Sequence, residues 1–300
     1  MLKFKTWISA ARLRTLPLSI AGILIGTGMA VREGFFDLNI LIFALLTTLG
    51  LQVLSNFAND YGDGIKGTDN EDRIGPMRAL QSGIISDKEM KTAMIITSLI
   101  TLTFAGILIF IAFEKDQVFN VLLFFGLGIL AVIAAIKYTV GKTAYGYRGL
   151  GDIFVFLFFG LLSAVGSYFL YTHTLNYTIW IMAAIVGLLS TAVLNLNNMR
   201  DRESDKKSGK ITLVVKLGEN KAKKYHFALI LISFILSLIY ISNDPNYLNW
   251  FILIAFIPLL IHLKVVRENK IPKNLDPELK KVALSTVFFA LIYLLTGFFY

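Results

Sequence analysis

The stretch "SNFANDYGDGIKGTDNEDRIGPMRALQSG", residues 55–83, gathers acidic side chains in a chain that is otherwise 56% hydrophobic. Its carboxylates are those of Asp60, Asp63, Asp69, Glu71 and Asp72. Carboxylates packed this closely repel one another unless a cation lies among them. The stretch therefore predicts a cation site, and the sequence on either side indicates where in the fold that site lies.

Long apolar runs precede and follow this stretch, and the mean hydropathy of +0.67 is typical of a membrane protein. Nine segments contain no Lys, Arg, Asp or Glu: 16–31, 38–58, 92–113, 117–136, 153–171, 178–199, 225–242, 247–263 and 282–300. Each is about long enough for a helix to cross roughly 30 Å of hydrocarbon. In lipid, a helix satisfies its own backbone hydrogen bonds. We expect an all-α polytopic membrane protein with nine transmembrane helices, in one domain over residues 1–300.

The basic residues predict the orientation of this domain. If the N-terminus is cytoplasmic, all of the 29 Lys and Arg residues except Arg32 and Lys115 fall on the cytoplasmic side. Cytoplasmic loops of membrane proteins carry such an excess of basic residues. We therefore expect an integral membrane protein with its N-terminus inside and its C-terminus outside. The net charge of +9 then faces anionic lipid and not nucleic acid.

The composition also excludes some kinds of site. The chain has no Cys, which excludes disulfides, a thiol nucleophile and a thiolate metal site. His173, His226 and His262 have no partner in the sequence that suggests a base or a ligand. The first residues, "MLKFKTWISAARLRTLP", are basic and amphipathic, and they predict an interfacial helix that leads into the first span instead of a cleavable signal.

A second polar stretch, "VLNLNNMRDRESDKKSGKITL" at residues 193–213, comes at the end of the sixth apolar segment. The first polar stretch comes at the end of the second apolar segment in the same way. Asn59 and Asp63 are four residues apart, and so are Asp201 and Asp205. A spacing of four places side chains on one face of a helix. Both helix ends fall on the cytoplasmic side. A parallel repeat of a four-helix unit would bring them to the rim of one cavity.

Oxygen ligands without His or Cys suit a hard divalent ion. Mg²⁺ is held by few carboxylates and keeps positions for phosphate oxygens. Basic side chains lie beside the acidic residues in both polar stretches and in the loop between them: Lys66, Arg73, Arg78, Lys142, Arg148, Arg202, Lys206, Lys207 and Lys210. A metal ion and cationic side chains around a phosphate stabilise the charge that builds up as it leaves. The two stretches together predict a Mg²⁺ site for a diphosphate group.

Asn59-Asp60-x-x-Asp63 and Asp201-x-x-x-Asp205 resemble the two aspartate-rich motifs of the UbiA superfamily of intramembrane aromatic prenyltransferases. The resemblance covers nearly the whole chain and includes the number of spans. It implies a ring of helices around a central cavity, with the aspartate motifs at the cytoplasmic rim and a side opening for lipid.

The resemblance also implies which residues form the site. It implies that Mg²⁺ is held by Asn59, Asp63, Asp201 and Asp205. The catalytic residues would be Asp60, Asp63, Asp201, Asp205 and Lys142. The residues expected to bind substrate are Arg14, Asn56, Lys66, Arg73, Tyr138, Asn198 and Lys210. Gly67 and Gly209 depart from the family pattern, because each stands where a further aspartate is expected. Asp69 lies two residues beyond Gly67, and this shift leaves it without an assigned role.

Longer motifs narrow the resemblance to the branch that prenylates 1,4-dihydroxy-2-naphthoate. They are "RLRTLPLS" (12–19), "NDYGDGIKGTDNEDRIGPMRALQSG" (59–83), "YGYRGLGDIFVFLFFG" (145–160) and "NNMRDRESDKKSGKITLVVKLG" (197–218). The likeness implies transfer of a polyprenyl group from polyprenyl diphosphate to 1,4-dihydroxy-2-naphthoate within membrane lipid, in the bacterial cytoplasmic (inner) membrane. Loss of CO₂ and diphosphate would give demethylmenaquinone.

Two alternatives remain open at this stage. Another branch of the superfamily, such as 4-hydroxybenzoate polyprenyltransferase or a haem-farnesylating enzyme, shares the two motifs. An ion-coupled transporter is the alternative of a different class, because intramembrane carboxylates often mark ion paths. The acidic residues here lie at the ends of spans and none is near the middle of one, which favours the prenyltransferase. The length of the prenyl tail, the oligomeric state and the group that removes the ring proton stay open.

Overall fold

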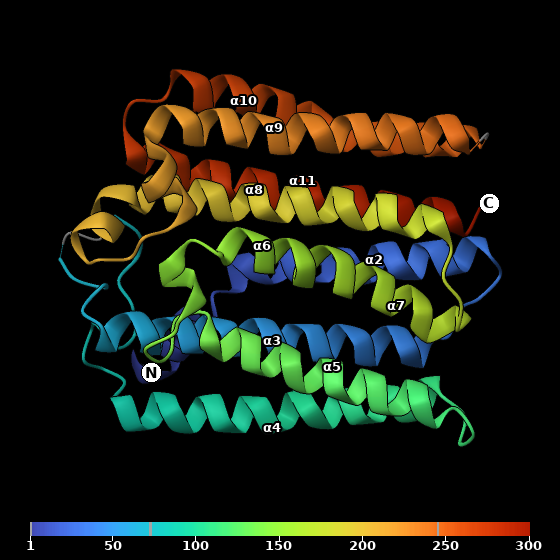
Figure 1. Ribbon diagram of the computed structural model, residues 1–300, viewed down its shortest axis with the longest axis horizontal. Helices are drawn as coiled ribbons and strands as arrows, with labels where there is room; N and C mark the ends of the chain where they lie inside the picture. Colours follow the sequence, from blue (N-terminus) through green and yellow to red (C-terminus); the bar gives the residue numbers. More distant parts are fainter. Residues whose placement is uncertain (1, 72–73, 245) are drawn as a thin grey trace.

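The computed structural model describes residues 2–71, 74–244 and 246–300, apart from the side chain of Arg14. Every element within these residues is a helix (Figure 1). The first half contains α1 (Leu2–Ala11), η1 (Leu13–Thr15), α2 (Leu16–Arg32), α3 (Leu38–Ile65), α4 (Asp87–Ala112), α5 (Val118–Lys137) and η2 (Tyr145–Arg148). The second half contains α6 (Gly151–Val155), η3 (Phe156–Leu162), α7 (Ser163–Thr172), α8 (Tyr177–Lys207), α9 (Leu213–Asn243), η4 (Tyr247–Phe256), α10 (Ile257–Glu268), η5 (Pro272–Leu275) and α11 (Asp276–Gly297).

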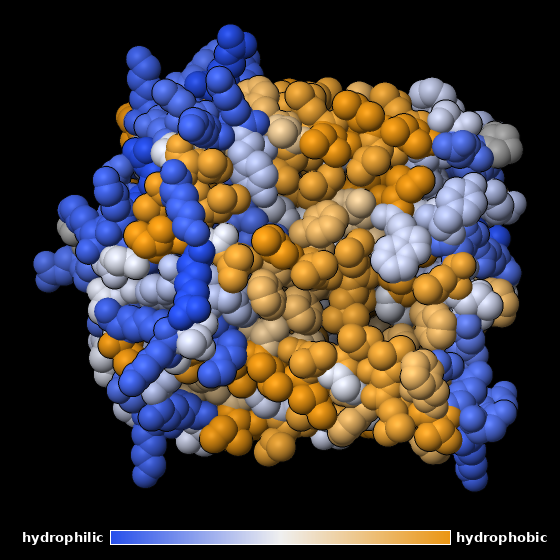
Figure 2. Space-filling view, in the orientation of Figure 1, coloured by the Kyte–Doolittle hydropathy of each residue, from blue (hydrophilic) through white to orange (hydrophobic). Residues whose placement is uncertain are grey.

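Eight helices in the described part of the chain are long and apolar enough to cross a membrane. The pair α1 and α2, bent by 42°, gives a ninth if it is counted as one span. An all-α membrane protein is thus confirmed, with eight or nine candidate spans. Figure 2 shows the apolar band, with hydrophilic side chains gathered at its two ends. The two termini lie at opposite ends of the molecule (Figure 1).

The bend before the first span lies at Arg12. This residue has φ 50° and ψ 59°, the left-handed conformation that residues other than glycine seldom adopt. Pro17 then occupies the first turn of α2. Proline is tolerated there because a backbone N–H in the first turn has no hydrogen-bond partner within the helix. The backbone turn at Arg12 separates the basic helix α1 from the span and directs the Arg12 side chain toward the end of α3.

Small residues allow the helices around α2 to come very close together. A Cβ atom on Gly26 would lie 1.9 Å from Ser167 Oγ of α7. On the other side of α2, a Cβ on Gly28 would lie 3.0 Å from the Cα of Leu294 in α11. Helices in lipid associate through this kind of close packing, because lipid tails offer no hydrophobic driving force. Substitution of these glycines would therefore separate α2 from its neighbours.

The fifth span contains a π-helix, η3, between α6 and α7. Gly160 of η3 packs directly on α8, where an added Cβ would lie 2.5 Å from the Cα of Gly187. π-Helical segments are rare and frequently occur at functional sites. Here the segment is held tightly against α8.

His226 and His262, which have no apparent partner in the sequence, bond to each other in the fold. Their Nε2 atoms are 2.8 Å apart, and both side chains are completely buried. The Nδ1 atom of His262 bonds to Glu278, whose other oxygen lies 2.7 Å from the ammonium of Lys281. This chain of contacts joins α9, α10 and α11. The sequence does not reveal this contact, because residues far apart in sequence are adjacent in a helix bundle.

Candidate active site

A cavity of about 490 Å³ lies between α2, α3, α4, α5, the fifth span, α8 and α11. Most of its wall is apolar. Its polar side chains include Arg12, Asn56, Asn59, Asp63, Arg78, Tyr138, Asn197, Asp201 and Lys210. These residues come from the ends of helices and the loops that follow them, so the cavity has a polar end and an apolar interior.

The last turns of α3 carry the first acidic motif into this polar end. Asp63 is only 1% exposed, and its Oδ2 accepts a hydrogen bond of 3.1 Å from Asn59 Nδ2. Its Oδ1 accepts a hydrogen bond of 2.7 Å from the hydroxyl of Tyr147. The Arg12 guanidinium donates to the side-chain oxygen of Asn59. The predicted spacing of four therefore places Asn59 and Asp63 in direct contact on one face of α3.

Lys210 connects the two acidic motifs. Its ammonium lies 3.2 Å from Asp63 Oδ2 and 3.6 Å from Asp205 Oδ1. Burial on its own would lower the pKa of Lys210, but the negative charges of Asp63 and Asp205 outweigh this effect and raise the pKa above its ordinary value. Lys210 is therefore a fixed positive charge between the two motifs at neutral pH.

The second motif is held by Arg200, whose side chain is 1% exposed. Its Nε donates to Asp201 Oδ1 at 2.8 Å and its Nη2 donates to Asp201 Oδ2 at 2.6 Å, a bidentate pair. The same Nη2 lies 2.8 Å from Asn197 Oδ1. Nothing in the sequence pattern marks Arg200, because adjacent residues on a helix do not normally face each other. Arg200 fixes the direction in which Asp201 presents its oxygens.

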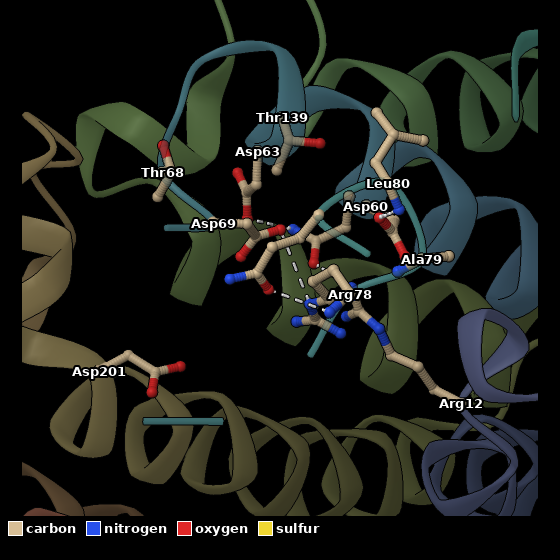
Figure 3. Close-up of polar contacts among 12 residues, drawn as sticks. Arg12, Asp60, Asp63, Thr68, Asp69, Arg78, Ala79, Leu80, Thr139 and Asp201 are labelled. Carbon is tan, nitrogen blue, oxygen red and sulfur yellow. Dashed lines mark hydrogen bonds and ion pairs between the residues drawn. The ribbon is translucent and has the colours of Figure 1, made fainter. Parts of the chain in front are cut away.

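Asp60 has a different environment from Asp63. It is completely buried and does not line the cavity described above. Its two oxygens accept hydrogen bonds from the backbone N–H groups of Ala79 (3.0 Å) and Leu80 (3.2 Å). Figure 3 shows these contacts beside Arg78. Asp60 therefore anchors the loop after α3, and the catalytic role expected from the motif stays a prediction.

Other residues predicted to form the site divide into those that reach the cavity and those that do not. Asn56 and Tyr138 line it, and burial raises the pKa of Tyr138 to about 12, so its hydroxyl stays protonated at neutral pH. The buried Asn198 does not line it; its neighbour Asn197 does. Three further residues require separate comment: Lys66, Lys142 and Arg73.

Lys66 is exposed, donates to the carbonyl oxygen of Thr139 at 2.7 Å and lies 3.8 Å from the centre of the Tyr147 ring. Lys142 is exposed in the turn after α5 and is not part of the cavity wall. Neither of these two lysines is brought into the cavity. Arg73 and the side chain of Arg14 lie outside the described residues.

Two arginines that were not among the predicted substrate-binding residues do line the cavity. Arg12 reaches it from the turn after α1, and Arg78 reaches it from the loop that Asp60 anchors (Figure 3). Arg78 Nε lies 3.8 Å from Asp69 Oδ2, which gives Asp69 a partner. Arg12 belongs to the basic N-terminal segment and Arg78 to the first polar stretch, but their direction depends on backbone turns that the sequence pattern does not reveal.

The donor set at the polar end fits Mg²⁺. Among the described residues, no group of three or more Asp, Glu and His side chains is close enough to form a metal site by itself. Mg²⁺ in proteins commonly binds one or two carboxylates and completes its shell with water and substrate phosphates. The Asn59–Asp63 and Asp201–Asp205 pairs offer this set on two helices that face the same space, as Asp63 and Asp201 show in Figure 3.

The profile of the UbiA prenyltransferase family matches residues 19–292. The chain belongs to this family. Among UbiA proteins it is 42% identical over 292 residues to the 1,4-dihydroxy-2-naphthoate octaprenyltransferase of Escherichia coli (strain K12), covering 97% of this chain and 94% of that protein. The enzyme of the same name from Mycobacterium tuberculosis is 31% identical over 293 residues, covering 97% of this chain and 96% of that protein. Close relatives thus match it over nearly their full length.

Solved structures of UbiA proteins share the fold. A UbiA homologue from Archaeoglobus fulgidus, bound to DMAPP and Mg²⁺, matches with a TM-score of 0.66 at 19% identity, over 95% of this chain and 98% of that one. The apo form of a UbiA homologue from Aeropyrum pernix K1 matches with a TM-score of 0.67 at 14% identity, over 91% of this chain and 96% of that one. The UbiA fold predicted from the two motifs is confirmed.

Proposed function

We propose that this UbiA protein is a 1,4-dihydroxy-2-naphthoate polyprenyltransferase of menaquinone synthesis. The observation that carries the proposal is the identity of 42% over nearly the whole chain to the Escherichia coli enzyme of that activity. The cavity supports it, because a charged end beside an apolar interior suits a substrate with a diphosphate head and a hydrocarbon tail.

At the polar end, Asn59, Asp63, Asp201 and Asp205 would hold Mg²⁺, which supplies positive charge to the departing diphosphate. Lys210 would donate to the phosphate oxygens from between the two motifs. Arg12 and Arg78 line the same end and add positive charge for anionic groups of the two substrates.

The reaction breaks the bond between the allylic carbon and the diphosphate oxygen, and the electron pair leaves with the diphosphate. A ring carbon of the dihydroxynaphthoate forms the new bond to the allylic carbon. The ring loses its carboxylate as CO₂, which gives demethylmenaquinol, the reduced form of demethylmenaquinone. The apolar wall of the cavity keeps water away from the electron-poor allylic carbon.

We also propose that the polar end faces the cytoplasm. The loops that carry most of the basic residues lie at this end, together with both acidic motifs. The diphosphate substrate and the aromatic acid would then reach the site from the side on which soluble metabolites are found.

The function is tested with the purified protein in detergent or lipid. Octaprenyl diphosphate and Mg²⁺ are supplied with either 1,4-dihydroxy-2-naphthoate or 4-hydroxybenzoate, and prenylated product and CO₂ are measured. We expect prenylation of the naphthoate with release of CO₂, loss of activity with EDTA and recovery with Mg²⁺. Prenylation of 4-hydroxybenzoate alone would assign the chain to another UbiA branch, and inactivity with every acceptor would overturn the proposal.

A further inference from the structure

The third of the longer motifs, residues 145–160, begins in the loop after α5, and none of the predicted site residues lies in it. The first part of this motif folds as η2, and Tyr147 of η2 is half-buried. Tyr147 does not line the cavity. Its side chain nevertheless contacts Asp63, which does. The motif therefore reaches the site through a residue that lies behind one of the carboxylates.

The hydroxyl of Tyr147 belongs to a directed chain of hydrogen bonds. It donates to Asp63 Oδ1 at 2.7 Å and lies 2.6 Å from Thr68 Oγ1. An ionised carboxylate only accepts hydrogen bonds, and a phenol hydroxyl has one proton to donate. The hydroxyl of Thr68, which is 4% exposed, must therefore donate to Tyr147. The chain runs from Thr68 through Tyr147 to Asp63.

Other contacts fix the ring and the backbone of Tyr147. The ammonium of Lys66 lies 3.8 Å from the centre of the ring, which is a cation–π contact. The backbone N–H of Ile211 donates to the carbonyl oxygen of Tyr147 at 3.3 Å. The ammonium of Lys216 donates to the carbonyl oxygen of Arg148 at 2.7 Å. The end of α3 and the segment after α8 thus hold η2 between them, which gives the Tyr147 hydroxyl a defined position.

The two oxygens of Asp63 are held by different groups. Oδ2 accepts a hydrogen bond from Asn59 Nδ2 and lies 3.2 Å from the ammonium of Lys210. Oδ1 accepts the hydrogen bond from Tyr147. Bonds to both oxygens restrict the rotation of the carboxylate. Because each carboxylate oxygen has about two acceptor positions, Oδ1 can bind a metal ion while Tyr147 holds it.

We propose that Tyr147 is a positioning residue for Mg²⁺ binding, whose hydroxyl fixes the Asp63 carboxylate in the orientation that takes the metal. The proposal rests on the proposed function, which assigns Asp63 to Mg²⁺. Hydrogen-bond partners behind a metal ligand typically contribute about 10- to 100-fold to metal affinity. Since Tyr147 does not line the cavity, its effect belongs to metal binding and not to the chemical step.

Tyr147→Phe tests this role, because it removes the hydroxyl and keeps the ring beside Lys66. Metal binding is measured without turnover, by electron paramagnetic resonance of free Mn²⁺, which takes the same oxygen ligands as Mg²⁺. We expect the Kd for Mn²⁺ and the Mg²⁺ concentration for half-maximal prenyl transfer to rise about tenfold or more. At saturating Mg²⁺, kcat should stay within about twofold of that of the unmodified protein. The lost hydrogen bond also costs stability, so every variant is measured below its unfolding transition.

Tyr145→Phe is the matched control. It removes a hydroxyl from the same loop, two residues away, and this hydroxyl donates to the carbonyl oxygen of Ala134 at 2.9 Å. Tyr145 lines the cavity, so the comparison uses only the Kd for Mn²⁺, which should equal that of the unmodified protein. Thr68→Val is a second test variant. It removes the donor to Tyr147 and should raise the Kd for Mn²⁺ by a smaller factor.

An unchanged Kd for Mn²⁺ in Tyr147→Phe, or an equal rise in Tyr145→Phe, would overturn the positioning role. A fall in kcat at saturating Mg²⁺ with an unchanged Kd would also overturn it. If Tyr147→Phe does not fold, an unchanged Kd in Thr68→Val decides against the proposal. Inactivity of the unmodified protein with every acceptor would instead overturn the proposed function, and the Mn²⁺ measurements would still test the role of Tyr147.

Discussion

The ammonium of Lys210 lies 3.2 Å from Asp63 Oδ2, although 147 positions separate the two residues in the chain. This contact joins the end of α3 to the loop after α8. It also brings a positive charge to the place where two sets of carboxylates converge, since Asp205 lies 3.6 Å from the same ammonium. The polar end of the cavity is thus organised around one lysine as well as around the acidic motifs.

Lys210→Met should lower prenyl transfer about a hundredfold or more, because it removes a cation placed to stabilise the leaving diphosphate. The raised pKa of Lys210 means that its charge persists at neutral pH and is lost only above the ordinary lysine range. Lys206→Met, which removes an exposed charge from the end of α8, is the control and should retain activity. Equal activity of the two variants in a prenyl transfer assay would contradict the role given to Lys210.

Asp60→Asn and Asp63→Asn should differ in their effect on prenyl transfer by the folded protein. The Asp60 variant loses an acceptor for a buried backbone N–H, which should cost about 2 kcal/mol of unfolding free energy. The Asp63 variant should lose prenyl transfer even where it stays folded, and it should also lose stability, because the buried ammonium of Lys210 loses one of its two carboxylate partners. Thermal unfolding in detergent and the activity of the folded protein distinguish the two. An inactive Asp60 variant of normal stability would show that this carboxylate takes part in the chemistry.

His262→Ala should destabilise the protein without changing its chemistry. The substitution removes the partner of His226 and of Glu278, both of which are buried, and about 2 kcal/mol should be lost. None of the three lines the cavity, so kcat per folded molecule should stay the same. Unfolding midpoints and active-site titration provide the measurement. A changed KM for either substrate at unchanged stability would go against this expectation.

Lys206→Cys and Lys115→Cys should react with a membrane-impermeant thiol reagent from opposite sides of the membrane. Both positions are exposed, both substitutions remove one positive charge, and the chain has no other cysteine. In intact cells Lys115→Cys should be labelled, whereas Lys206→Cys should require broken membranes. Labelling of both from outside would refute the proposed orientation.

The sequence predicts the parts of this molecule that depend on local periodicity. The runs without charged residues correspond to the spans, and the spacing of four does place Asn59 beside Asp63. The UbiA family is also evident from the two aspartate-rich motifs, and the longer motifs around them are specific to one branch of it.

Contacts that depend on the direction of side chains were harder to predict. Arg200 holds Asp201 although the two are adjacent, and His226 meets His262 across two helices. Arg12, whose own backbone is left-handed, reaches Asn59 from the turn after α1. Each of these depends on the direction of a side chain in the assembled bundle, which a one-dimensional pattern does not contain.

The hydrogen bonds of Asp60 have a consequence for the genetics of the enzyme. Asp60 and Asp63 lie in one motif, yet one holds a loop and the other faces the cavity. A damaged Asp60 allele should be temperature-sensitive and open to suppression by stabilising mutations elsewhere in the gene. A damaged Asp63 allele should be null at every temperature and resist such suppressors. Strict retention of both residues during evolution would therefore reflect two different selective pressures.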